Sequence, residues 1–222
     1  MLLQKNKKII LYLFLFIIIG TLNNRNLRNE NLLKDININV TGLDQISNAK
    51  LINNLNLLKM NNLFFLDEKK IKKILNSNNL IEKFFIFKKY PSTLDIKVYK
   101  TIFLAQLKKK DDIFFLGSNR KLIKSNKIVK DIPFIFGDFR IENFFQLKKA
   151  ITKSNFNFNK IKNLFFFKSG RWDIETESGL LIKLPKENIQ QSLELSQKIL
   201  NKNDKKIKII DLRQHKQVII NE

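Results

Sequence analysis

An apolar run near the amino terminus constrains this chain more than any other feature. It extends from Ile9 to Leu22 and is broken only by Gly20 and Thr21. As a helix it would be roughly 21 Å long, which is short for a hydrocarbon core of about 30 Å and also suits a signal-peptide core. Lys7 and Lys8 precede the run, and no small-x-small cleavage pattern follows it. The run therefore predicts an uncleaved transmembrane anchor, with cleavage or a buried helix as the alternatives.

The charge of the chain is high, but its distribution does not favour nucleic-acid binding. There are 42 basic and 20 acidic residues, a formal net charge of +22, yet only six of the basic residues are Arg. The lysines are scattered among Asn, Ile and Phe, whereas nucleic-acid binders concentrate cations and use Arg at base contacts. We interpret the lysines as solvated surface positions and expect no nucleic-acid partner.

The residue types needed for most catalytic or metal sites are scarce. The chain has no Cys and a single His, His215, which excludes disulfides, thiolate chemistry and the usual zinc sites. No phosphate-binding or nucleophile motif is present. Neighbouring acids such as Asp111 and Asp112 lie among lysines and fit a hairpin tip. We therefore expect no enzyme activity, no metal and no cofactor.

The first half of the body predicts a compact α+β unit. Alternating apolar residues predict strands over residues 36–40, 81–89 and 93–100. Ser47 and Asp67 are candidate N-caps for two amphipathic helices between the first two strands. The order is β-α-α-β-β, in which two helices can cover one face of a three-stranded sheet.

The second half predicts a mainly antiparallel β domain with two helices. The runs FLAQL, IFFLG, KLIK and PFIFG suggest short antiparallel strands, and residues 162–185 suggest a three-stranded meander. An apolar stripe of Phe144, Leu147 and Ile151 predicts one helix. Pro185 is expected at the start of the other helix, where its missing N–H is tolerated. The predicted fold class is α+β, with a transmembrane helix, a small β-α-α-β-β domain and this larger domain.

The chain ends in KIIDLRQHKQVIINE, Lys208 to Glu222, which predicts two strands around a polar break. A last strand leaves an unpaired edge, which either completes the sheet or accepts a partner strand through main-chain hydrogen bonds. From the residues alone both interpretations stay open. The candidate partner-binding residues are Gln214, Lys216, Gln217, Val218, Ile219 and Ile220.

Several short motifs follow one another in a fixed order: VTG, NLF, FKKYPSTLDIKV, IPFIFG, GRWD, LP and IDLR. In this order, behind a single anchor, they resemble the FtsQ/DivIB family of bacterial cell-division proteins over nearly the whole chain. The residues selected as structural markers of the motifs are Val40, Gly42, Pro91, Gly170, Arg171, Trp172, Gly179, Pro185, Asp211 and Arg213.

The resemblance implies a single-pass inner-membrane scaffold of the divisome, located at the septum and without catalysis. Its parts would be a cytoplasmic N-terminus (1–8), an anchor (9–22), a linker (23–35), a periplasmic POTRA domain (36–100) and an FtsQ-type β domain (101–222). It further implies that FtsB, with FtsL, docks at the last strands and that other division proteins use the POTRA domain. Other POTRA proteins of outer-membrane secretion or assembly, and a secreted polyanion-binding protein, are the alternatives.

Four residues near the motifs have mainly structural interpretations. Trp172 is expected to pack in the sheet, and Arg171 to pair with Asp173 or Glu175. Asp211 and Arg213, two apart on one predicted strand, would share a face and form an ion pair.

Overall fold

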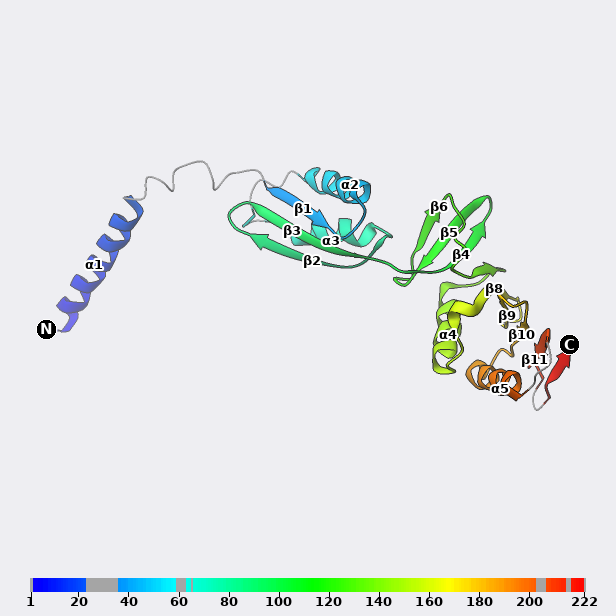
Figure 1. Ribbon diagram of the computed structural model, residues 1–222. Coiled ribbons are helices and arrows are strands. Elements are labelled where there is room, and N and C mark those ends of the chain that lie inside the picture. Colours follow the sequence, from blue (N-terminus) through cyan, green and yellow to red (C-terminus); the bar gives the residue numbers. More distant parts are fainter. Residues whose placement is uncertain are drawn as a thin grey trace. The chain divides into compact units, whose positions relative to one another are not determined.

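The computed structural model describes residues 2–22, 36–58, 63–64, 66–202, 207–214 and 217–221 (Figure 1). The chain divides into two compact units, Met1–Lys100 and Thr101–Glu222, and each is described by itself.

The first helix, α1, spans Leu2–Leu22 and contains the apolar run. Its described apolar side chains are largely exposed; Ile10 is 67% exposed and Phe16 78%. No helix among the described residues combines the length and the apolar character that crossing a membrane requires.

The rest of the first unit has the expected β-α-α-β-β order. It consists of β1 (Asn37–Thr41), α2 (Gln45–Asn56), α3 (Glu68–Ser77), β2 (Ile81–Lys89) and β3 (Thr93–Lys100). The strand order is β1-β3-β2, with β1 parallel and β2 antiparallel to β3. Leu51 and Leu55 of α2 and Ile71 and Leu75 of α3 are buried in one core with the inner face of the sheet.

Aspartates are the N-caps of both α2 and α3. Asp67 caps α3, accepting a hydrogen bond from the Lys69 backbone N–H at 3.0 Å, as predicted. The prediction that Ser47 caps α2 is wrong. The cap is Asp44, whose carboxylate accepts from the backbone N–H of Ser47 at 3.0 Å, so Ser47 lies inside the first turn.

Three motif residues shape the turns and core of this unit. Val40 is buried in the core, and Pro91 follows a cis peptide bond in the turn between β2 and β3. Gly42 ends β1 with a φ of 115°, and a Cβ atom at this position would collide with the Val98 carbonyl oxygen. Only glycine suits this close approach of two backbones.

The second unit is built on a nine-stranded sheet of order β12-β11-β10-β9-β8-β7-β4-β5-β6. Its elements, in chain order, are β4 (Phe103–Lys109), β5 (Asp112–Gly117), β6 (Leu122–Ser125), β7 (Phe134–Phe136), α4 (Ile141–Lys153), the 3-10 turn η3 (Phe158–Lys160), β8 (Ile161–Phe166), β9 (Trp172–Thr176), β10 (Leu181–Lys183), α5 (Ile189–Lys202), β11 (Ile209–Asp211) and β12 (Ile219–Asn221).

The sheet is less antiparallel than the sequence suggests. Helices α4 and α5 are crossover connections between parallel strands, and β7 also pairs with β4 in parallel. Five strand pairs are antiparallel and three are parallel. The expectation that PFIFG forms an antiparallel strand is wrong, since β7 is parallel to both β4 and β8. Buried Gln106 of β4 holds the loop that precedes β7: its Nε2 donates to the Ile132 carbonyl at 3.0 Å, and its Oε1 accepts from the Val129 N–H at 3.0 Å.

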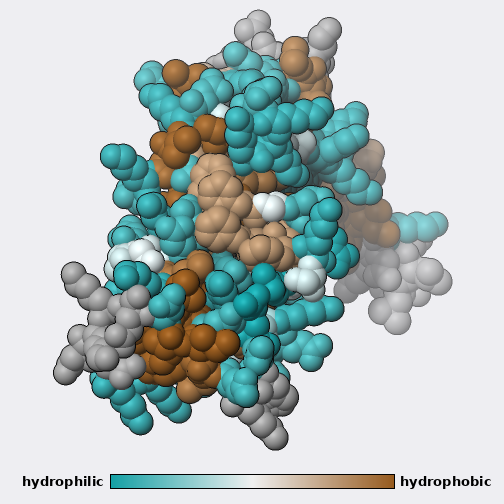
Figure 2. All heavy atoms as spheres, turned by 90° about the vertical axis from the view of Figure 1, so that its right-hand side faces the viewer, coloured by the Kyte–Doolittle hydropathy of each residue, from teal (hydrophilic) through white to brown (hydrophobic). Residues whose placement is uncertain are grey.

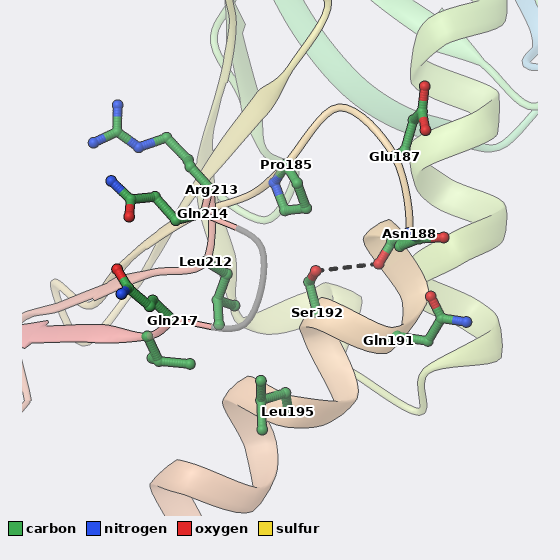
Figure 3. Close-up of a pocket in the computed structure, with 11 residues that line it drawn as sticks. Pro185, Glu187, Asn188, Gln191, Ser192, Leu195, Leu212, Arg213, Gln214 and Gln217 are labelled. Carbon is green, nitrogen blue, oxygen red and sulfur yellow. Dashed lines mark hydrogen bonds between the residues drawn. The ribbon is translucent and has the colours of Figure 1, made fainter.

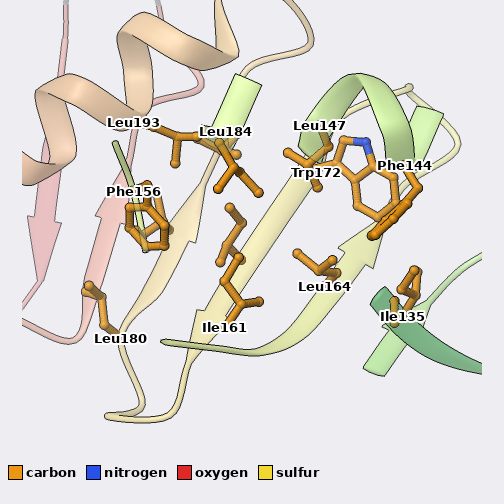
Figure 4. Packing of buried hydrophobic residues seen from close by; sticks show 14 of the residues in the cluster. Ile135, Phe144, Leu147, Phe156, Ile161, Leu164, Trp172, Leu180, Leu184 and Leu193 are labelled. Carbon is orange, nitrogen blue, oxygen red and sulfur yellow. The ribbon is translucent and has the colours of Figure 1, made fainter. Parts of the chain in front are cut away.

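One row of apolar side chains crosses six neighbouring strands and is the part of the sheet that packs in the core. Cross-strand pairing aligns Ile135, Leu164, Ile174, Ile182, Ile210 and Ile220. The first five are at most 2% exposed, whereas Ile220 at the edge is 40% exposed. Phe144 and Leu147 of α4 and Leu193 of α5 are fully buried against the sheet (Figure 4).

Helix α5 begins at Ile189, so the prediction that Pro185 starts it is wrong. The N–H of Leu184 donates to the Trp172 carbonyl at 3.0 Å, which keeps the chain beside β9 at this point. Asn188 has a φ of 57°, and its carbonyl accepts the first helical hydrogen bond from Ser192. The left-handed backbone of Asn188 thus separates the proline from the helix.

Substitution of Leu193 tests the core. Leu193→Ala should lower the free energy of unfolding of the second unit by about 2–5 kcal/mol, because a fully buried side chain leaves a cavity. Leu195→Ala on the same helix is the control. It should cost under about 1 kcal/mol because Leu195 is 42% exposed. Urea titration followed by the fluorescence of Trp172, the single Trp, measures both. Equal losses would contradict this assignment of the core.

Candidate docking edge and groove

The candidate site is the outer edge of β12, the last strand of the sheet. β12 pairs with β11 on one side, and within the described part of the chain no strand pairs with its other side. Ile219 is 54% exposed and Ile220 is 40% exposed. Figure 2, turned so that the right-hand side of Figure 1 faces the viewer, shows hydrophobic atoms gathered in patches on the visible surface.

The pairing of the neighbouring strands determines which main-chain groups of β12 point outward. The Leu181 N–H donates to the Lys208 carbonyl at 2.8 Å, and the Leu212 N–H donates to the Lys183 carbonyl at 2.9 Å. In this parallel register the N–H and C=O of Ile210 face β10. Because these directions alternate along a strand, β11 turns Ile209 and Asp211 toward β12.

In β12 the partners of these two residues are Asn221 and Ile219. The main-chain groups of Ile220, which lies between them, therefore point away from the sheet. A partner strand would find one N–H donor and one C=O acceptor at Ile220, the arrangement that strand addition uses.

A groove lies between helix α5 and the tail, which is the segment that follows β11, and it has a volume of about 490 Å³ (Figure 3). One side consists of residues that precede or belong to α5, and the other of residues that follow β11. The lining residues are Pro185, Glu187, Asn188, Gln191, Ser192, Leu195, Leu212, Arg213, Gln214, Gln217 and Val218. Apolar side chains with amide groups around them suit a peptide segment better than a small charged ligand.

An ion pair follows β11 directly. Arg213 Nε donates to both carboxylate oxygens of Asp211, at 2.8 and 2.9 Å, and the Arg213 backbone N–H donates to Asp211 Oδ1 at 3.1 Å. Asp211 is buried, and the hydrogen bonds from Arg213 lower the pKa of its carboxyl. The prediction that both residues lie on the strand is wrong, because β11 ends at Asp211. The pair forms nevertheless, since the chain folds Arg213 back over the carboxylate.

A second aspartate, Asp173, has a pKa that is shifted in the opposite direction. Asp173 on β9 is buried, and its burial raises the pKa of its carboxyl, partly offset by Arg171. Arg171 Nε lies 3.9 Å from Asp173 Oδ1, and neither atom has a hydrogen-bond partner among the described residues. The expected ion pair of Arg171 with Asp173 is therefore present without a hydrogen bond, and the guanidinium also stacks over the Phe167 ring at 4.3 Å. Glu175 accepts from Asn163 Nδ2 at 2.8 Å.

The remaining motif residues lie in the core or at turns. Trp172 is 2% exposed and packs against Phe166 and Phe139, with ring centroids 4.8 and 5.8 Å away. Gly170 and Gly179 are at the turns that follow β8 and β9, both with φ of 84°.

The structure brings together some of the residues proposed from the sequence. Gln214, Gln217 and Val218 line the groove, and Ile219 and Ile220 form β12. Lys216 and His215 lie outside the described residues. Pro185 and Arg213, which were noted only as motif residues, also line the groove.

Sequence reasoning missed the contribution of α5 to this groove. Asn188, Gln191 and Leu195 line it from the helix side. Leu195 was detectable in principle, because it is a leucine outside the buried stripe that contains Leu193. Among the described residues, no group of three or more His, Cys, Asp or Glu side chains is arranged to hold a metal ion.

Comparisons with known proteins agree with this architecture. The model of the POTRA domain, FtsQ-type, matches residues 33–100, and the model of the cell division protein FtsQ/DivIB, C-terminal, matches residues 115–213. The fold is therefore a POTRA domain followed by an FtsQ-type C-terminal domain. The chain belongs to the FtsQ/DivIB family, which gives it a role in bacterial cell division.

One relative is the cell division protein FtsQ of Rickettsia bellii (strain RML369-C). It is 22% identical over 184 residues, which cover 79% of this chain and 68% of the relative. The solved extracytoplasmic domain of DivIB from Geobacillus stearothermophilus, in its trans isomer, aligns with 48% of this chain and 98% of its own length. Its identity of 12% and TM-score of 0.34 are too low to add to the family assignment.

The two aspartates should respond oppositely to neutralisation. Asp211 has a lowered pKa, so its ion pair stabilises the fold fully above the ordinary aspartate pKa of about 3.9. The effect is lost below that value, as the pH falls through the lowered pKa of the folded state. Asp211→Asn should therefore cost about 1.5 kcal/mol at neutral pH and much less in acid.

Asp173→Asn is the matched control for this substitution. Its raised pKa means that the ionised form destabilises the fold at neutral pH, so the amide should be neutral or stabilising. Urea unfolding at neutral and acidic pH, followed by Trp172 fluorescence, measures both variants. A cost for Asp211→Asn that stays constant with pH would contradict the ion-pair explanation.

Proposed function

We propose that this protein is a non-enzymatic scaffold of the divisome that captures a partner strand on the outer edge of β12. The observation that supports this most is the outward-facing main chain at Ile220, beside two exposed isoleucines at the end of a buried apolar row. Membership of the FtsQ/DivIB family supplies the setting in which such an edge would be used.

The proposed mechanism is addition of a tenth strand to the nine-stranded sheet. Main-chain hydrogen bonds to Ile220 would give affinity, and alternate side chains of the partner would give specificity. The partner side chains on the face of the sheet that α4 and α5 cover would extend the apolar row beyond Ile220. Val218, two residues before Ile220, lines the groove beside α5, so a flanking part of the partner has room next to Leu195.

The partner proposed for this edge is FtsB, together with FtsL. The contact residues proposed from the sequence are Gln214, Lys216, Gln217, Val218, Ile219 and Ile220, and the groove adds Leu195 and Gln191 to this proposal. Other division proteins would use the POTRA domain.

The proposed location is the inner membrane at the septum, with residues 1–8 cytoplasmic, 9–22 as the anchor, 23–35 as a linker and the rest periplasmic. The exposed apolar side chains of α1, such as Ile10 and Phe16, support membrane association, because an exposed apolar surface of this kind needs a cover. Restriction to a membrane would raise the effective concentration of partners held in the same plane.

The docking mechanism is tested by Ile220→Pro, which removes the outward N–H and leaves the ladder to β11 in place. Full-length protein in detergent is used to capture the extracytoplasmic part of FtsB from the same organism. Binding should weaken at least about tenfold, because one donor is lost and the proline ring blocks the edge.

Ile220→Thr is the matched control, since it keeps the N–H and the strand preference but removes part of the apolar contact. It should weaken binding less than the proline does. The midpoint of urea unfolding, followed by Trp172 fluorescence, shows whether each variant remains folded. Unchanged binding by a folded Ile220→Pro protein would reject the edge as the docking site.

A further inference from the structure

The sheet of the first unit has a face that its helices leave uncovered. Leu94, Ile96 and Val98 of β3 point toward α2 and α3 and are at most 2% exposed. On the opposite face, Phe85 is 47% exposed, Phe87 51% and Tyr99 37%. Phe85 lies 6.4 Å from the Phe87 ring and 6.0 Å from the Tyr99 ring, so the three rings form one aromatic patch.

Lysines surround this aromatic patch. Cross-strand pairing places Lys83 opposite Tyr99 and Lys97 opposite Phe85. Their Nζ atoms lie 4.6 and 5.4 Å from the centroid of the Tyr99 ring. The exposed side of β2 and β3 therefore alternates cations with aromatic rings.

Two acidic groups nearby, Asp95 and Glu68, are paired with other lysines. Asp95, opposite Phe87, accepts hydrogen bonds from Lys89 and from Asn39 Nδ2, and the contact with Lys89 lowers the pKa of Asp95. Glu68, on α3, pairs with Lys88 at 2.9 Å. Lys83 and Lys97 thus stand beside the rings with no carboxylate recorded within ion-pair distance of them in the described part of the chain.

This combination suits the surface of an anionic bilayer. Tyr has an apolar ring with one polar end and is favoured at the membrane interface, and Phe rings bury in the head-group and acyl boundary. Each nearby Lys strengthens attraction to anionic lipid about fivefold. The face carries no Arg, the usual residue for nucleic-acid bases and for bidentate phosphate contacts. Fifteen residue steps separate the end of α1 from β1, so the start of β1 stays within roughly 50 Å of the end of α1.

We propose that the face formed by Lys83, Phe85, Phe87, Lys97 and Tyr99 docks on anionic phospholipid head groups. The rings enter the head-group region, and the lysines contact lipid phosphates. The proposal rests on the membrane location in the proposed function. It would hold the POTRA domain flat on the bilayer instead of leaving it free on its tether.

The test uses the full chain with Phe85→Trp, reconstituted with vesicles of phosphatidylglycerol and phosphatidylethanolamine that contain a head-group quencher. The signal of the unsubstituted protein, from buried Trp172, is subtracted. The new Trp should be quenched and blue-shifted in anionic vesicles, and neither change should occur with phosphatidylcholine alone. Adding Lys83→Gln or Lys97→Gln should weaken docking about fivefold for each lysine.

The matched control is Ile46→Trp, on the helix-covered side of the same unit, where Ile46 is 82% exposed. This Trp should stay unquenched. Equal behaviour of the two probes would overturn the proposal. Quenching of the Phe85→Trp probe by a single-stranded oligonucleotide but not by anionic vesicles would overturn it in favour of nucleic-acid binding.

Vesicle flotation separates this proposal from the proposed membrane location. Flotation through α1 persists at high salt and with neutral lipid, whereas docking through the lysines is screened by salt. A chain that floats at high salt with an unquenched Phe85→Trp probe retains its membrane location and refutes the docking face. A chain that floats only at low salt on anionic vesicles refutes the anchor, and it supports the docking face only if the Phe85→Trp probe is quenched; with an unquenched probe it refutes both. A chain that never floats refutes both.

Discussion

The apolar row across the nine-stranded sheet is the constraint on which the second unit depends. It requires Ile135, Leu164, Ile174, Ile182 and Ile210 to share one register, and it is covered by α4 and α5. Helix α4 connects β7 to the parallel strand β8, and α5 connects β10 to the parallel strand β11, because a connection through a helix returns the chain in the same direction. The row ends at half-exposed Ile220, so the candidate docking edge is a direct consequence of how the core is built.

The candidate edge consists of main-chain groups that any residue supplies, so its selectivity must come from the side chains around it. The Asp211–Arg213 pair turns the chain after β11, and the tail that follows lines the groove against α5. Exposed Leu195 of α5 and the side-chain amides of Gln214 and Gln217 across the groove give this edge a chemical character that a bare strand lacks. The uncovered face of the POTRA sheet differs from it, since aromatic rings alternate there with lysines.

Sequence reasoning succeeded where the determinants are local. The cap at Asp67 and the buried positions Ile71 and Leu75 follow from helical spacing, and both are confirmed. It failed at Ser47 and Pro185, because several polar or helix-compatible residues precede each helix and tertiary contacts choose among them. For α5 the deciding contact is the Leu184 N–H on the Trp172 carbonyl, which holds the chain against the sheet until Asn188. No local pattern contains that information.

By itself the sequence determined the fold class, the β-α-α-β-β order and the absence of Cys-based chemistry, since periodicity and composition are properties of neighbouring residues. Only the tertiary structure decided the parallel placement of β7, the groove between α5 and the tail, and the outward direction of the Ile220 main chain. Each of these depends on pairing between segments far apart in the chain. Strand register and direction are set when such segments pack together, and a one-residue shift would turn every side chain to the other face.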